Sequence, residues 1–111
     1  MDAISTTMIL KALDGLSARS AATAENIANA GSPNYRPVRV AFEELMAAAA
    51  PGGADAVRSV RPRLEQLAGT EGVRLDLELA TASSTAMRYS ALIELLGRQI
   101  QLHALSITGN R

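Results

Sequence analysis

The chain has 111 residues and is 48% hydrophobic, but alanine supplies 21 of these residues and only three residues are aromatic. We therefore expect one domain with too little bulk for a full core, which neighbouring chains complete. The balance of eleven basic and eleven acidic residues gives no electrostatic signature of nucleic-acid binding, and the absence of cysteine excludes disulfides. The first residues lack a basic stretch followed by an apolar run, so we expect no cleaved secretory signal and no membrane insertion.

Residues 1–30 are expected to form the first of two long helices. Apolar and small residues recur there in alternating steps of three and four, which is the spacing of one helix face. This stripe consists of Thr6, Ile9, Leu13, Leu16, Ser20, Thr23 and Ile27. We expect Ile9, Leu13 and Leu16 to lie in a helix-packing interface.

An elaborate helix stop follows. The side-chain amides of Asn26 and Asn29 can bond the backbone groups that a helix end leaves free. Gly31 suits the left-handed conformation that caps many helices. Residues 31–37 are therefore expected to be a specified turn and not a simple loop.

The centre of this turn carries a proline, an asparagine and an aromatic residue. Pro33 and Asn34 suit the two middle positions of a type II turn, because the second position needs a positive φ that Asn adopts at low cost. Tyr35 would leave the turn with its ring fixed relative to the helix.

Residues 38–75 are expected to form an irregular middle segment with a short extended element. A helical turn or two over 41–46 precedes the low-complexity run AAAAPGGADA at 47–56, which we expect to be a mobile loop. Residues 57–68 contain Pro62 and several arginines, and we expect them to be extended or irregular.

The second long helix is expected over residues 76–108. The alternation of Val73, Leu75, Leu77 and Leu79 with charged residues predicts a strand-like stretch through Leu75, although Asp76 could equally cap the helix. Heptad-like spacing then recurs, and we expect its members Tyr89, Ile93, Leu96, Ile100 and Ile107 to form the helix-packing interface.

The fold class expected from these elements is mainly α, with the two terminal helices packed antiparallel as a coiled-coil-like pair. Gly15 and Gly97 interrupt these helices. Each is either a tolerated imperfection or a point of close backbone contact with a neighbouring helix.

Candidate catalytic chemistry is sparse. His103 is the single histidine and lies on the helical seam, where a packed or interface histidine is expected. The acidic pairs Glu43–Glu44 and Asp76/Glu78 are expected on solvated faces, and the arginines at 58, 61 and 63 are expected to contact solvent or another subunit. We expect no catalytic, cofactor-binding or metal-binding residue and no enzyme.

The helix stop resembles the N-terminal signature of bacterial flagellar axial proteins of the rod and hook. Its usual form is Asn-Ile-Ala-Asn, two residues, then Thr/Ser-Pro-Gly-Tyr, and the matching assembly motif here is Asn26, Ile27, Asn29, Ser32, Pro33, Asn34 and Tyr35. Asn34 stands where Gly is usual, which is the substitution that a positive φ permits.

The C-terminal part resembles the proximal rod protein family (FlgB) of the flagellar basal body. There, an extended element similar to residues 73–80 (VRLDLELA) precedes a helix bearing Tyr-x-Ala, as at Tyr89. Arg74 stands where Asp is usual, and residues 80–85 lack the usual Met and Asn. The two resemblances together cover about residues 1–45 and 72–109.

These resemblances imply a structural subunit of the flagellar rod, whose terminal helices pack into the axial tube that transmits torque from motor to hook. The implied partners are copies of itself, other rod proteins, the junction protein between rod base and MS ring, and the flagellar type III export apparatus. The implied location is the rod within the periplasmic space, after export without a cleaved signal. The terminal helices would be frayed in the free subunit and become ordered on assembly.

The alternative is a helical-hairpin adaptor or export chaperone that forms a closed coiled-coil dimer. It explains the heptad spacing of residues 86–107 but not the specified turn. The two classes differ in solution, because an adaptor forms a stable helical dimer whereas a rod subunit is monomeric when dilute and polymerises when concentrated.

Overall fold

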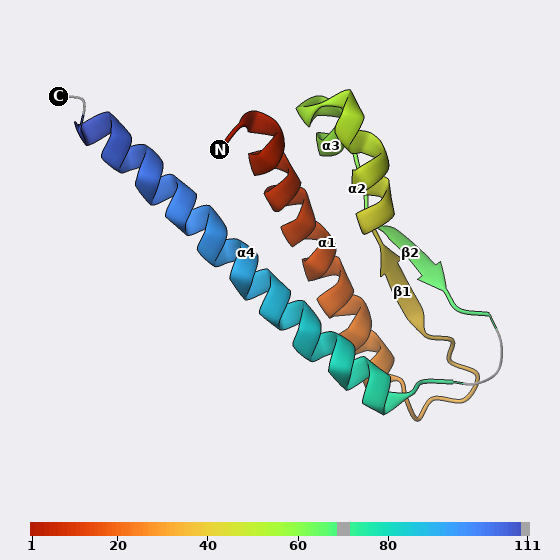
Figure 1. Cartoon of the computed structure of the whole chain (residues 1–111). Helices are drawn as coiled ribbons and strands as arrows, with labels where there is room; N and C mark the ends of the chain where they lie inside the picture. Colours follow the sequence, from red (N-terminus) through yellow and green to blue (C-terminus); the bar gives the residue numbers. More distant parts are fainter. Residues whose placement is uncertain (69–71, 110–111) are drawn as a thin grey trace.

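The computed structural model describes residues 1–68 and 72–109 of the chain. Helix α1 (Ala3–Ala28) is followed by strand β1 (Val38–Ala41), helix α2 (Glu43–Ala49), the 3-10 helix η1 (Ala50–Gly52), helix α3 (Ala54–Arg58), strand β2 (Arg63–Gln66) and helix α4 (Leu75–Gly109). The prediction of a mainly helical fold with two long terminal helices in contact is confirmed (Figure 1).

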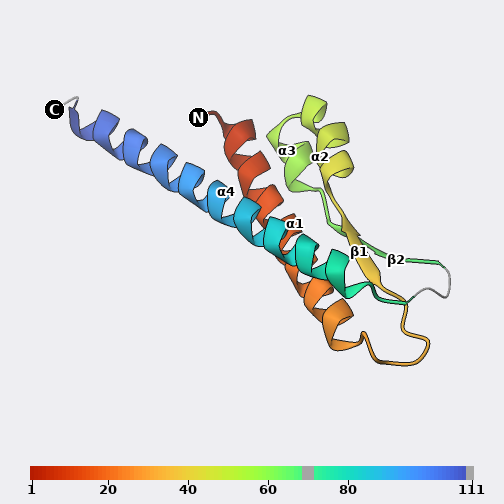
Figure 2. The same ribbon diagram turned by 60° about the horizontal axis from the view of Figure 1, so that its bottom comes forward.

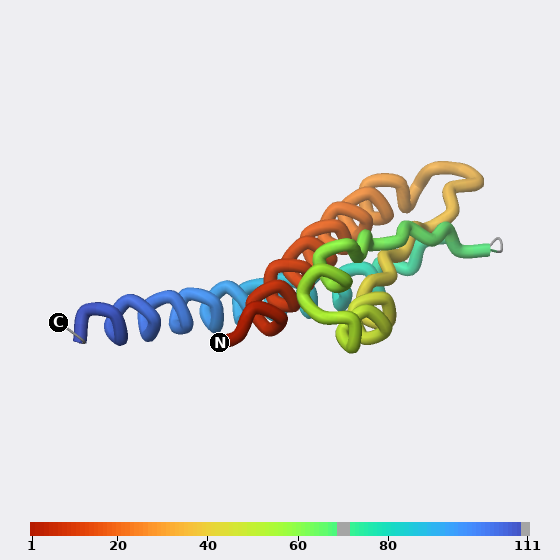
Figure 3. Tube along the Cα trace, turned by 90° about the horizontal axis from the view of Figure 1, so that it is seen from above, coloured from red at the N-terminus to blue at the C-terminus, as the bar shows by residue number. Residues whose placement is uncertain are grey.

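Helix α1 is the centre of the molecule. Helix α4 runs antiparallel to α1 along one side, and α2, α3 and β1 contact α1 elsewhere (Figures 1 and 2). Seen from above, the C-terminal part of α4 extends away from all other elements (Figure 3). The radius of gyration is 17.5 Å, whereas a compact domain of this length has about 13 Å. The chain is therefore strongly elongated.

The ends of α1 follow from local hydrogen bonds. The Asp2 carboxylate accepts a bond from Ser5 N–H (2.8 Å) at the start of the helix, as an N-cap does. At the other end, Asn29 is the capping residue and its side chain donates to Glu25 O (2.9 Å). The prediction of a left-handed cap at Gly31 is wrong, because Gly31 does not have a positive φ. The side-chain amide of Asn29 instead bonds the free Glu25 carbonyl at this helix end.

The core lies between α1 and the middle segment. Leu16, Val40, Phe42 and Met46 are buried together, and β1 pairs antiparallel with β2 from Val38↔Gln66 to Ala41↔Arg63. A Cβ at Gly15 would overlap the ring of Phe42, whereas a Cβ at Gly97 would meet open space. Gly15 is therefore a point of close contact, with the Phe42 ring of the same chain and not with a neighbouring helix. Gly97 makes no such contact within the described part of this chain.

The prediction of a mobile loop over residues 47–56 is wrong, because most of this stretch is helical. Helix α2 continues through Ala49, η1 follows, and α3 begins at Ala54. Alanine has the highest helix propensity of all residues, and Pro51 lies in the first turn of η1, where its missing N–H costs nothing. Gly53 then makes the bend at φ 87°.

The strand-like stretch expected through Leu75 is also wrong, because α4 already begins there. Acidic residues in a first turn are favourable to the helix dipole, and Asp76 and Glu78 occupy that turn. The alternating pattern is misleading because Leu77 is 47% and Leu79 is 59% exposed, whereas Glu78 is buried. Within the described ranges, no helix is apolar over enough of its length to cross a membrane.

Candidate assembly site

The specified turn has the predicted geometry at its centre. Asn34 has φ 62°, and Tyr35 N–H donates to Ser32 O (3.3 Å), which closes a four-residue turn. The positive φ expected at Asn34 is confirmed. Ser32 and Pro33 are exposed, so this part of the assembly motif faces solvent.

Asn26, by contrast, is fully buried and joins three segments of the chain. Its Oδ1 accepts from the Tyr35 hydroxyl (2.8 Å) and from Val38 N–H (2.9 Å). Its Nδ2 donates to Val38 O (2.9 Å) and to Glu78 Oε2 (3.1 Å). The amide thus pairs with the backbone of β1 as a neighbouring strand would, and also reaches the first turn of α4. The expectation that Asn26 bonds its own helix end is wrong.

Glu78 is the charged member of this group and is only 1% exposed. Arg39 Nη1 lies 2.7 Å from Glu78 Oε1, close enough for an ion pair, although the angle between the groups is not that of a hydrogen bond. We call Asn26, Tyr35, Val38, Arg39 and Glu78 the Asn26 clasp. The solvated face expected for Glu78 is wrong, because its partners are 39 to 52 residues away in the sequence and leave no local signal.

The environment of the clasp keeps the Tyr35 hydroxyl a proton donor. Burial, together with the nearby carboxylates of Glu25 and Glu78, raises the pKa of Tyr35. A neutral hydroxyl can then donate to Asn26 Oδ1, and the ring is fixed relative to α1 as the sequence predicted.

The predicted helix-packing residues fall into two groups. Ile9, Leu13 and Leu16 on α1 are buried. On α4, Leu96 is half-buried, whereas the other members are exposed: Tyr89 (40%), Ile93 (46%), Ile100 (62%) and Ile107 (54%). The α4 residues of lowest exposure form a different line, which consists of Glu78, Thr81, Ala82, Thr85, Leu92, Leu96 and Gln99. The seam predicted for α4 is therefore displaced by about one residue from the face that meets α1.

Beyond Leu92, α4 carries two exposed apolar stripes; we call residues 93–109 the α4 arm. Ile93, Ile100 and Ile107 recur every seven residues along one side, and Leu95 and Leu102 recur along another. With 3.6 residues per turn, the line that faces α1 runs between these stripes. Glu94, Arg98 and Gln101 lie on the remaining face together with the exposed Leu105 (67%), and Arg98 donates to Glu94 there (2.7 Å).

A second polar group joins α1, α2 and α4 near the core. Arg19 donates two hydrogen bonds to the Glu43 carboxylate (both 2.7 Å) and one to Val40 O (2.8 Å), and its guanidinium lies 4.7 Å above the Phe42 ring. Arg88 of α4 reaches the same carboxylate at 3.4 Å. The hydrogen bonds from Arg19 lower the pKa of Glu43 to about 2.

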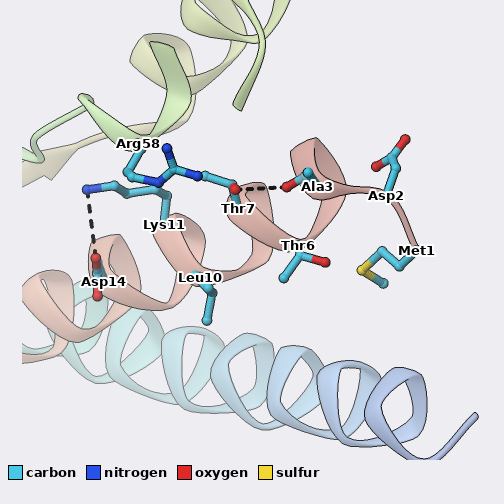
Figure 4. A pocket seen from close by; sticks show the side chains of 9 residues that line it. All are labelled: Met1, Asp2, Ala3, Thr6, Thr7, Leu10, Lys11, Asp14 and Arg58. Atoms are coloured by element: carbon cyan, nitrogen blue, oxygen red, sulfur yellow. Dashed lines mark hydrogen bonds and ion pairs between the residues drawn. The ribbon is translucent and has the colours of Figure 1, made fainter. Parts of the chain in front are cut away.

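A hollow of about 620 Å³ lies beside the N-terminal end of α1 (Figure 4). Its charged groups are already engaged: Lys11 donates to Val60 O (3.1 Å), and Arg58 pairs with Asp55 of its own helix. His103 lies on the exposed α4 arm beside a smaller hollow. Within the described residues, no group of three or more acidic or histidine side chains is placed to hold a metal ion.

Comparisons of the sequence with protein-family models and with curated proteins found no match.

Proposed function

We propose that this protein is a structural subunit of the bacterial flagellar rod, most similar to proximal rod proteins. In this proposal it assembles by packing its terminal helices into the axial tube that transmits torque from motor to hook. The carrying observation is the pair of apolar stripes on the α4 arm. The resemblance of the assembly motif at the end of α1 to flagellar axial proteins also supports the proposal.

Two stripes on different sides of one helix favour an open assembly over a closed dimer. A two-stranded coiled coil covers a single seam on each helix. The stripe of Ile93 and Ile100 and the stripe of Leu95 and Leu102 are separated by the line that faces α1. Two different neighbours can therefore cover them, and such repeated heterologous contacts build a helical array.

The total surface supports the same proposal. The chain exposes 7364 Å², whereas a compact monomer of 11.6 kDa exposes about 5,800 Å². The difference of about 1,500 Å² is roughly twice the ~800 Å² that each partner buries in a standard protein–protein interface, which is enough surface for contacts with two neighbours. Burial of this area by neighbours would complete the apolar packing that the composition leaves short.

The proposal includes the partners and the location that the resemblance implies. The neighbours would be copies of this chain, other rod proteins and the junction protein at the rod base, and the flagellar type III apparatus would export the chain without a cleaved signal. The subunit would then act in the rod within the periplasmic space. No nucleic acid, membrane insertion or catalytic step is part of this proposal.

The direct test is deletion of the gene in its own bacterium, followed by imaging of purified basal bodies. We expect the rod above the membrane ring to be lost while the export apparatus is still assembled. Basal bodies with complete rods would contradict the proposal.

A matched pair of substitutions tests the stripes themselves. Ile100→Asp should abolish incorporation into the rod, because assembly would bury an unpaired charge. Gln101→Asp, on the same turn but outside both stripes, should be incorporated normally. Equal incorporation of the two variants would show that the stripe faces solvent in the assembled state.

The closed-dimer adaptor remains the second candidate, favoured by the seven-residue recurrence of Ile93, Ile100 and Ile107. Sedimentation of the purified protein over a concentration series separates the two. A rod subunit should move from monomer to open-ended polymers, whereas an adaptor should stop at a dimer.

A further inference from the structure

We propose that the Asn26 clasp is the pivot that sets the direction in which the α4 arm leaves the molecule, with Glu78 as the positioning residue. This role concerns the conformation of the single chain and does not depend on the proposed function.

Two contacts of the clasp hold the first turn of α4. Asn26 holds Glu78 Oε2 from α1, and Arg39 holds Oε1 from β1. Asn26 is itself fixed by both backbone groups of Val38. A carboxylate that is 1% exposed must keep its partners, because burying an unpaired charge is strongly unfavourable. The start of α4 is therefore tied to α1 and to β1 at once.

Away from the clasp, few large side chains join α4 to α1, and Leu92 and Leu96 are the half-buried ones. A hollow of about 340 Å³ lies between the two helices and is lined by mostly small residues: Leu16, Ser17, Ser20, Thr85, Ala86, Tyr89 and Ser90. Small side chains give shallow ridges, so they do not lock two helices at one crossing angle. The nearby ion pair between Arg88 and Glu43 is half-exposed at 3.4 Å and adds little.

The length of α4 amplifies any change at the pivot. From Glu78 to Ile107 the helix extends about 44 Å at 1.5 Å per residue. A rotation of about 10° at the clasp would displace Ile107 by roughly 8 Å. That displacement is nearly the 8–10 Å distance between the axes of two packed helices, so the clasp decides where both apolar stripes are presented.

The absence of cysteine in the chain allows a direct distance measurement. Spin labels on the exposed positions Ala21→Cys in α1 and Ser106→Cys in the α4 arm report the angle of the arm by double electron–electron resonance. The dilute, monomeric protein should give one narrow distance distribution, in contrast to the frayed terminal helices that the resemblance to rod proteins implies.

Removing the counter-charge should free the arm. In Arg39→Gln, Glu78 is left charged and without its cation, so α4 should swing out to hydrate the carboxylate and the width of the distribution should at least double. The double variant Arg39→Gln/Glu78→Gln buries a neutral amide that still accepts from Asn26, and it should regain the narrow distribution. Contacts that act only by shape would not produce this recovery.

Arg74→Gln is the matched control, because Arg74 forms an exposed ion pair with Asp76 at the same end of α4 (2.9 Å). Its distribution should be that of the unaltered protein. A narrow distribution in Arg39→Gln, or a broad one in the double variant, would overturn the proposal. Should Arg39→Gln alone fail to fold by circular dichroism, the double variant decides: a folded chain with a narrow distribution supports the pivot, and a broad or unfolded one refutes it.

Discussion

The two terminal helices have similar apolar spacing but opposite environments. Helix α1 buries eight of its 26 residues, whereas α4 buries only Glu78 and Thr85 of its 35. Eleven large apolar side chains are exposed on α4, but only Leu10 is exposed on α1. Periodicity therefore identifies an apolar face equally well in both helices, but it does not say whether the same chain covers that face.

The largest expected effect comes from placing the same charge on the two helices. Leu13→Asp should reduce the free energy of unfolding by about 4 kcal/mol or more, because Leu13 is 8% exposed and burial of a carboxylate there is strongly unfavourable. Ile100→Asp should change it by less than about 0.5 kcal/mol in the monomer, since Ile100 is 62% exposed. Urea unfolding of the dilute protein measures both. Similar losses in the two variants would mean that the monomer covers the α4 arm.

Replacing the glycine in each long helix by alanine should change the free energy of unfolding by a smaller amount, downward in α1 and upward in α4. Gly15→Ala should lower the free energy of unfolding by about 2 kcal/mol, because the new methyl group overlaps the buried Phe42 ring and this outweighs the gain in helix propensity. Gly97→Ala meets open space and should raise it by up to about 1 kcal/mol. Thermal unfolding followed by circular dichroism compares the two. Stabilisation by Gly15→Ala would show that Phe42 does not pack on α1.

The turn after α1 should contribute to the stability of the folded chain. Asn34→Val should lower the free energy of unfolding by about 1–2 kcal/mol, because a β-branched residue resists the φ of 62°. Asn34→Gly should be close to neutral, and we expect rod assembly to follow the same order. Urea midpoints measure the difference. If Val and Gly are equally tolerated, the turn does not require a positive φ.

Local rules in the sequence predicted much of this fold. The spacing of Ile9, Leu13 and Leu16 predicted the buried face of α1, and turn chemistry predicted the conformation of Asn34. The same rules misassigned residues 47–56, because the weight given to Pro51 and the glycines hid the helix propensity of the alanines. Local rules therefore served best where one segment determines its own conformation.

The clasp and the arm could not be predicted in this way. Glu78 appears as one acid among alternating leucines, and its burial depends on Asn26 and Arg39 in distant segments. The seam on α4 was assigned to Ile93 and Ile100 because they are the most apolar positions in register. Small residues such as Thr85 face α1 instead. Which face of α4 meets α1 depends on the shape of the α1 surface, and the apolar spacing of α4 alone does not show it.

The smallest effect concerns which helix holds Glu43. Its pKa is lowered from 4.5 to about 2, so the ionised form stabilises the folded state above about pH 4.5, and this contribution is lost as the pH falls toward 2. Because the side chain is 46% exposed, we expect about 1 kcal/mol and not the full value of the shift. Arg19→Gln should remove this pH-dependent part of the free energy of unfolding, whereas Arg88→Gln should leave most of it, since the bonds from α1 are 2.7 Å and the contact from α4 is 3.4 Å. Urea unfolding at pH 7 and pH 3 gives the two differences. An equal loss in both variants would mean that α4 holds the Glu43 carboxylate as firmly as α1 does. The contrast between a packed α1 and a weakly held α4 would then not apply to the contact at Glu43.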